Sequence, residues 1–202
     1  NRNPNLILHS STFYTSKFRK FRILFQKSDT TLKYECNKDS DYLLKKHMDR
    51  IIGRYTGEKK GPLLICIGGM HGNEPAGVQA LELMFKMLEI EPMTNPRFNY
   101  SGRVLGLRGN VQAIKLGKRF LKKDLNRQWK KAEVERIINA SIADLKDEDL
   151  EMRELLDVIK NEISEYQPSD VVVLDIHTTT AFGGIFSIAS GDPQSVRIAV
   201  EL

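Results

Sequence analysis

Apolar positions in this chain form short continuous runs that alternate with stripes at helical spacing. The continuous runs predict buried strands at residues 63–67, 103–107, 171–177 and 183–189. The stripes predict helices between them, of which two are well marked: one with Val78, Leu81, Phe85 and Leu88 on one face, and one with Met152, Leu155, Leu156, Ile159 and Ile163. A charged helix is expected before the second of these, and the polar residues 111–128 show no regular pattern.

This order of strands and helices predicts an α/β fold. We expect a three-layer sandwich with a mixed, largely parallel central sheet, because a helix between two strands brings them into one sheet as parallel neighbours. Gly-Pro at residues 61–62 leads into this main domain, which we place at residues 61–202.

The first 60 residues have a pattern of their own. Apolar residues alternate with polar ones over 21–25 and again over 32–36, with a turn signal at 28–30, which predicts a hairpin. Apolar residues at helical spacing then predict a helix from about residue 40 to Tyr55. We expect residues 1–60 to pack on the main domain as a hairpin and helix. At the other end, residues 195–202 have the pattern of a helix that is still running, so we expect the main domain to be C-terminally incomplete.

Composition narrows the class of protein. The chain has 202 residues, of which 41% are hydrophobic, enough for the core of one domain. No apolar run approaches the roughly 20 residues that a membrane-spanning helix needs, so no membrane partner is expected. Two cysteines give no disulfide framework, and Cys66 lies within an apolar run, where a small core residue is the simplest interpretation. A reducing, cytoplasmic location is therefore predicted.

Charge is distributed unevenly along the chain. Residues 1–60 contain 14 Lys and Arg against 6 Asp and Glu, whereas the remainder contains 17 against 20. A basic leading segment can attract nucleic acid. Here the basic residues alternate with apolar ones and no recognition module is present, so a solvated surface is the preferred interpretation and no nucleic-acid partner is expected.

Candidate chemistry begins directly after the first strand of the main domain. The segment Gly-Met-His71-Gly-Asn-Glu74-Pro75 joins a strand to a helix, because proline suits the first turn of a helix. His177 ends the strand at 171–177, and the carboxyl ends of parallel strands meet at one edge of a sheet. Two histidines and a glutamate form a three-ligand zinc set with room for a water. Asp175 points to the same side of its strand as His177 and can orient that imidazole, or it can cap a neighbouring helix.

A third segment, residues 119–127, contains Arg119, Asp124, Asn126 and Arg127. A site that cleaves an acyl bond needs a donor for the developing oxyanion and a partner for a substrate carboxylate, and an arginine guanidinium supplies both. The plainer alternative is a solvated basic loop followed by the start of a helix near Trp129.

The ordered set of these motifs resembles the succinylglutamate desuccinylase/aspartoacylase family of zinc enzymes, which are relatives of the zinc carboxypeptidases. The resemblance covers residues 63 to about 190 and includes Gly109-Asn110 and Thr178-Thr179. It implies one Zn²⁺ held by His71, Glu74 and His177, and Arg119 as the catalytic group that stabilises the oxyanion. It further implies that Asn126 and Arg127 bind the substrate carboxylate and that Asp124 orients a ligand histidine.

The resemblance also implies a general-base glutamate well downstream of the second histidine. Only 25 residues follow His177, and Glu201 falls in a predicted helix rather than in the expected strand, so it is not assigned as the base.

The sequence therefore predicts a zinc-dependent amidohydrolase that acts on a small N-acyl amino acid. A metallocarboxypeptidase that trims C-terminal or cell-wall peptides is the alternative enzyme. A metal-binding interaction module without catalysis is the alternative from another class.

Overall fold

In the part of the chain that the structure describes, six strands form one mixed sheet. The computed structural model describes residues 18–26, 50–179 and 185–201. The strands lie in the order β2-β4-β3-β5-β1-β6. Neighbours among β4, β3, β5 and β1 are parallel, whereas β2 and β6 are antiparallel strands at the two edges. Their bounds are β1 (Phe18–Gln26), β2 (Ile51–Thr56), β3 (Lys59–Gly68), β4 (Ser101–Arg108), β5 (Val171–Thr179) and β6 (Phe186–Ile188).

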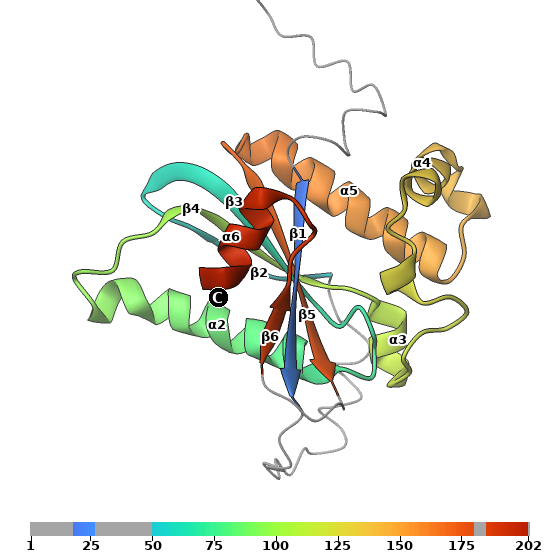
Figure 1. Cartoon of the computed structure of the whole chain (residues 1–202), viewed down its shortest axis with the longest axis horizontal. Coiled ribbons are helices and arrows are strands. Elements are labelled where there is room, and N and C mark those ends of the chain that lie inside the picture. Colours follow the sequence, from blue (N-terminus) through green and yellow to red (C-terminus); the bar gives the residue numbers. More distant parts are fainter. Residues whose placement is uncertain (1–17, 27–49, 180–184, 202) are drawn as a thin grey trace, which may run out of the picture.

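Helices cover this sheet (Figure 1). α2 (Pro75–Thr94) contacts β2, β3, β4 and β5, and α6 (Pro193–Glu201) contacts β1 and β6. α4 (Lys131–Asn139) packs against α5 (Glu148–Tyr166). The remaining elements are short: α3 (Val111–Leu116) and the 3₁₀ helices η1 (Leu125–Arg127) and η2 (Ile142–Asp144).

Two apolar layers result from the alternation of side chains along the central strands. Odd-numbered positions of β3 such as Leu63 and Ile65 pack with Met152 and Leu155 of α5, and Cys66 on the other face packs with Leu81 and Phe85 of α2. Each such fully buried aliphatic side chain contributes about 1.5–3 kcal/mol to stability. The arrangement is helix, sheet and helix, which confirms the predicted α/β sandwich with a mixed, largely parallel sheet.

The helix predicted from about residue 40 to Tyr55 is wrong over residues 51–55, which belong to strand β2 (Ile51–Thr56). A register shift interrupts its pairing with β4 between Ile51 and Gly53. A bulge of this kind breaks the period of two, so Ile51 packs in the α5 layer while Ile52 and Tyr55 pack in the α2 layer. The resulting spacing of apolar residues imitates a helix.

Other differences are smaller. The segment that leads into the main domain, expected from its Gly and Pro residues to be a loop, already belongs to β3 from residue 59, and the polar region 111–128 contains the helix α3. The first predicted strand of the hairpin corresponds to β1, but β1 pairs with β5 and β6. The second predicted strand at 32–36 and the helix before residue 50 lie outside the described residues. The division of the chain at residue 60 stays a prediction, and strands from both sides of it share the sheet.

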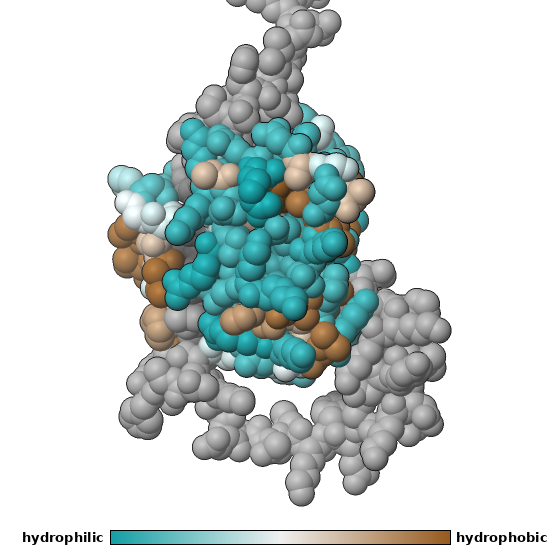
Figure 2. Space-filling model, turned by 90° about the vertical axis from the view of Figure 1, so that its right-hand side faces the viewer, coloured by the Kyte–Doolittle hydropathy of each residue, from teal (hydrophilic) through white to brown (hydrophobic). Residues whose placement is uncertain are grey.

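The surface also bears on the sequence predictions. In the described part of the chain, none of the helices combines the length and the apolar character that crossing a membrane requires. The side of the molecule that carries α3 and α4 is largely hydrophilic (Figure 2). Cys66 is buried as expected, with 2% of its surface exposed.

Candidate metal centre and the adjoining loop

The turn between β3 and α2 places His71 and Glu74. Gly68 ends β3, Pro75 begins α2, and the Glu74 backbone N–H donates to the His71 carbonyl at 3.0 Å. Gly69 has a φ of +73°, which glycine adopts without strain. A Cβ at Gly72 would lie 2.1 Å from the carbonyl carbon of Ala113, so the turn packs tightly against α3. Both site side chains are buried as a result.

β5 supplies the third side chain. In the parallel ladder Ile67 is opposite Asp175 and Gly68 is opposite Ile176, so His177 lies just beyond the end of β3. The parallel register thus brings a residue from position 177 beside the turn at 71–74. His177 is 2% exposed, and its ring centroid lies 4.9 Å from that of His71.

The Glu74 carboxylate lies between the two imidazoles. Its Oε1 is 2.7 Å from Nδ1 of His71, and its Oε2 is 3.0 Å from Nδ1 of His177. One ligand atom from each of these three side chains lies within 4.8 Å of the others, so they form a set that can hold a metal ion. The structure therefore brings together the three side chains that the sequence predicts as ligands.

A carboxylate lies behind each imidazole. Asp124 Oδ1 is 3.0 Å from Nε2 of His71, and Asp175 Oδ2 is 2.9 Å from Nε2 of His177. An imidazole that donates its Nε2–H to a carboxylate keeps a lone pair on Nδ1 and is held in one orientation. Both Nδ1 atoms face Glu74, so the two lone pairs and the carboxylate oxygens converge.

This arrangement fits a divalent cation. Three electron-pair donors that face one another repel unless a cation or shared protons lie between them. Desolvation by burial raises the pKa of Glu74, but its contacts with the His177 and His71 imidazoles and the hydrogen bond from the Thr178 N–H outweigh it and hold that pKa below its ordinary value of 4.5. Glu74 is therefore ionised at neutral pH, as a metal ligand must be.

The 119–127 loop lies beside this set. The Gly72 N–H donates to the Arg119 carbonyl at 3.2 Å. The Arg119 guanidinium is 3.6 Å from Glu74 Oε1 and 3.5 Å from Asp124 Oδ2, and its side chain is 47% exposed. Such long, half-exposed ion pairs leave the guanidinium available to another partner.

The predicted substrate-binding residues follow Asp124 directly. Asp124 accepts a hydrogen bond from the Asn126 N–H at 3.0 Å and so caps η1, which contains Asn126 and Arg127. Asn126 is half-buried and Arg127 is exposed. Burial raises the pKa of Asp124, but His71, the Asn126 N–H and Arg119 outweigh this effect and hold the pKa below its ordinary value. This carboxyl group is therefore also ionised at neutral pH.

Three groups near the site were not predicted. The Thr178 N–H donates to Glu74 Oε2 at 2.9 Å. Glu148 and Glu151 at the start of α5 accept hydrogen bonds from the backbone of the 119–127 loop and of α3, respectively. Acids in the first turn of a helix are normally ascribed to the helix dipole, and their partners here lie 25 to 40 residues away, so no local signal identifies them.

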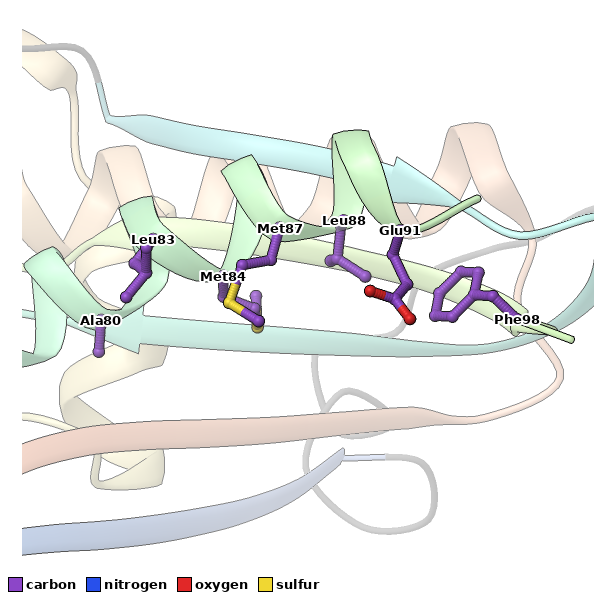
Figure 3. Close-up of a pocket in the computed structure, with 7 residues that line it drawn as sticks. All are labelled: Ala80, Leu83, Met84, Met87, Leu88, Glu91 and Phe98. Carbon is purple, nitrogen blue, oxygen red and sulfur yellow. The ribbon is translucent and has the colours of Figure 1, made fainter. Parts of the chain in front are cut away.

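A groove on α2 is separate from this cluster. It has a volume of about 490 Å³ and is lined by Ala80, Leu83, Met84, Met87, Leu88, Glu91 and Phe98. Figure 3 shows that α2 provides all of these side chains except Phe98. It shares no residue with the His-Glu-His set and offers one titratable side chain, so the candidate centre remains the polar cluster.

The fold and the cluster together define an α/β protein with a candidate metal centre at the carboxyl edge of a largely parallel sheet. Residues 60–200 match the family model of the succinylglutamate desuccinylase/aspartoacylase catalytic domain, and the chain belongs to this family. The family expected from the sequence motifs is thus confirmed.

Individual relatives match over shorter stretches. A probable aspartoacylase from a Nostoc species is 30% identical over 137 residues, covering 67% of this chain and 42% of the relative. A succinylglutamate desuccinylase from Pseudomonas paraeruginosa is 39% identical over 67 residues, covering 32% of this chain and 18% of the relative. The crystal structure of a succinylglutamate desuccinylase from Chromobacterium violaceum aligns with a TM-score of 0.40 at 19% identity, covering 59% of this chain and 35% of that chain. This chain thus spans less than half the length of these relatives.

Proposed function

We propose that this chain carries the metal centre of a zinc-dependent hydrolase that cleaves the amide bond of an N-acyl amino acid. The observation that carries this proposal is the convergence of His71, Glu74 and His177, with an aspartate behind each imidazole. Membership of the desuccinylase/aspartoacylase family and the names of the relatives support an acylated amino acid as substrate. The proposed partner of this chain is therefore a small-molecule substrate. We also propose the cytoplasm as the location of the protein, as expected from its cysteine content.

The proposed roles follow from the contacts. His71, Glu74 and His177 would hold one Zn²⁺, which when bound lowers the pKa of a water and polarises a carbonyl. Asp124 and Asp175 keep the two imidazoles in the tautomer with Nδ1 free for the metal. The half-exposed Arg119 guanidinium donates to the substrate carbonyl oxygen as negative charge develops on it. Asn126 and Arg127 bind the substrate carboxylate, for which the guanidinium of Arg127 offers two parallel N–H groups.

No general base is assigned among the described residues. The carboxylates in and beside the cluster are not free to act as the base, since Glu74 is a proposed metal ligand and Asp124 and Asp175 are hydrogen-bonded to the two imidazoles. Glu201 lies at the exposed end of α6.

The substrate class is tested with the zinc-loaded chain and a panel of N-succinylglutamate, N-acetylaspartate and short peptides. Amine release and calorimetric binding are measured for each compound. Binding or release confined to the acyl amino acids supports the proposal. A response confined to peptides would instead indicate a carboxypeptidase, and zinc binding without a response to any compound would favour an interaction module.

Arg127 offers a sharper test of carboxylate recognition. We expect Arg127→Lys to weaken the binding of acyl amino acids about tenfold, because lysine presents a point charge in place of a planar fork. Arg136→Lys in α4 is the matched control, since Arg136 pairs with Glu133 and Asp149. Equal affinities for Arg127→Lys and the unmodified chain would contradict the proposed role of Arg127.

A further inference from the structure

The carboxylate of Glu148 is fully buried at the start of α5 and receives four hydrogen bonds. Three come from consecutive backbone N–H groups, those of Leu121 at 2.5 Å and of Lys122 and Lys123 at 3.0 Å each. The fourth comes from the side-chain amide of Asn110 at 3.0 Å. A single carboxylate therefore binds three consecutive backbone N–H groups of one short segment, residues 121–123.

This segment lies between the two residues of the loop that contact the candidate metal centre. Arg119 precedes it and pairs with Glu74, and Asp124 follows it and contacts His71. The first end of the loop is also tied to the metal turn, because the Gly72 N–H donates to the Arg119 carbonyl. The position of residues 121–123 thus determines where the side chains of Arg119 and Asp124 can reach.

Packing alone does not fix residues 121–123. Leu121 is half-buried, and Lys122 and Lys123 are exposed. Bonds from N–H groups to an ionised carboxylate are stronger than neutral hydrogen bonds. Burial raises the pKa of Glu148, but the backbone donors and Asn110 outweigh it and hold that pKa below 4.5, so the carboxylate is charged at neutral pH.

We propose that Glu148 is the positioning residue of the 119–127 loop, which holds Arg119, Asn126 and Arg127 in place for a carboxylate-bearing substrate. The inference rests on the proposed function for the roles of these three residues. Glu148 acts through the loop backbone, on which it accepts hydrogen bonds.

Glu162 provides a matched comparison on the same helix. It is also buried, but its carboxylate pairs with Arg54 of β2 and Arg103 of β4. Replacing either glutamate by glutamine removes a buried negative charge at nearly constant volume. Only the replacement at Glu148 directs an amide N–H₂ group toward the loop N–H donors.

The experiment compares Glu148→Gln and Glu162→Gln at a temperature where both variants remain folded. Hydrogen exchange is measured at residues 121–123, and calorimetry gives the affinity of the zinc-loaded chain for N-acetylaspartate and N-succinylglutamate. Trp129 is the single tryptophan of the chain and lies two residues after the loop, so its fluorescence provides an independent measure of changes near this segment.

We expect Glu148→Gln to accelerate exchange at residues 121–123 and to weaken ligand binding, each by about tenfold or more. Ligand affinities are compared at saturating zinc, because Asp124 on the same loop contacts the proposed ligand His71 and a displaced loop can also lower zinc affinity. Glu162→Gln should leave loop exchange, Trp129 emission and ligand affinity unchanged.

Equal exchange at residues 121–123 in the two variants, or unweakened ligand binding by Glu148→Gln, would overturn the proposal. If the unmodified chain binds neither acyl amino acid, the proposed function fails. In that case the exchange and fluorescence measurements still decide whether Glu148 holds the loop.

Discussion

At the scale of single residues, each site histidine uses its two ring nitrogens for different tasks. In His71 and His177 alike, Nε2 contacts an aspartate, Asp124 or Asp175 respectively, and Nδ1 contacts Glu74. The pairs His71–Glu74 and Asp175–His177 could be predicted because each lies within one turn or one strand. The contact of Asp124 with His71 crosses 53 positions, and the sequence suggested it only through the family resemblance.

Cys66 allows a test at this scale. Burial raises the pKa of its thiol from 9.0 to about 12. At about pH 8 the reactive thiolate is then on the order of one part in ten thousand, so we expect iodoacetamide to react at least 100-fold more slowly than in the unfolded chain. The measurement uses Cys36→Ser, which leaves Cys66 as the single thiol. Similar rates for the folded and unfolded chains would show that Cys66 is accessible.

At the scale of elements, the sequence predicted the regular elements well and the irregular ones poorly. β3, β5, α2 and α5 have uninterrupted periodicity, whereas the bulge in β2 destroys the alternation on which strand prediction depends. α3 has six residues, too few for a periodic stripe, although Asn110 as N-cap and Gly117 after its end are recognisable signals.

The turn between β3 and α2 should not tolerate a side chain at Gly72. We expect Gly72→Ala to weaken zinc binding about tenfold or more and to cost about 1–3 kcal/mol of stability, because its Cβ would overlap the Ala113 carbonyl and displace His71. Gly117→Ala is the control: apart from its chain neighbours, none of the described residues has an atom within 4 Å of the added Cβ, so strain at a φ of +62° should lower stability while zinc affinity is kept. Zinc affinity of Gly72→Ala equal to that of the unmodified chain would be inconsistent with this packing.

The start of α5 should make the protein sensitive to acid. The pKa of Glu148 is lower in the folded chain than its ordinary value, so its stabilising contribution is complete above about pH 4.5 and is lost as the pH falls through the folded pKa. At about pH 7 we expect Glu148→Gln to unfold with about 1–3 kcal/mol less free energy than the unmodified chain.

Urea titrations at a series of pH values measure this difference. The two curves of stability against pH should converge in acid, since the unmodified chain loses its carboxylate there. Glu165→Gln at the exposed end of α5 should change stability by no more than about 0.5 kcal/mol. A constant gap between Glu148→Gln and the unmodified chain at all pH values would exclude a charged Glu148 as its cause.

At the scale of the whole molecule, the parallel sheet is what creates the site. β3 and β5 lie side by side and end at the same edge, so groups about 100 positions apart in the chain meet there. The order of strands and helices in the sequence predicted that the turn after β3 and the end of β5 lie at the same edge of the sheet. It could not predict that α5 reaches the same edge with Glu148 and Glu151, because helix packing is set by the apolar side of α5 rather than by its acids.

Metal content tests the central claim most directly. The chain and the variants His71→Ala, His177→Ala and Glu91→Gln are loaded with zinc, desalted and analysed for bound metal. One three-ligand site predicts about one zinc per chain for the unmodified protein and for Glu91→Gln, whose carboxylate lies on the separate α2 groove. Both histidine variants should lose the metal. Full zinc content in His71→Ala and in His177→Ala would contradict the assignment of the metal centre.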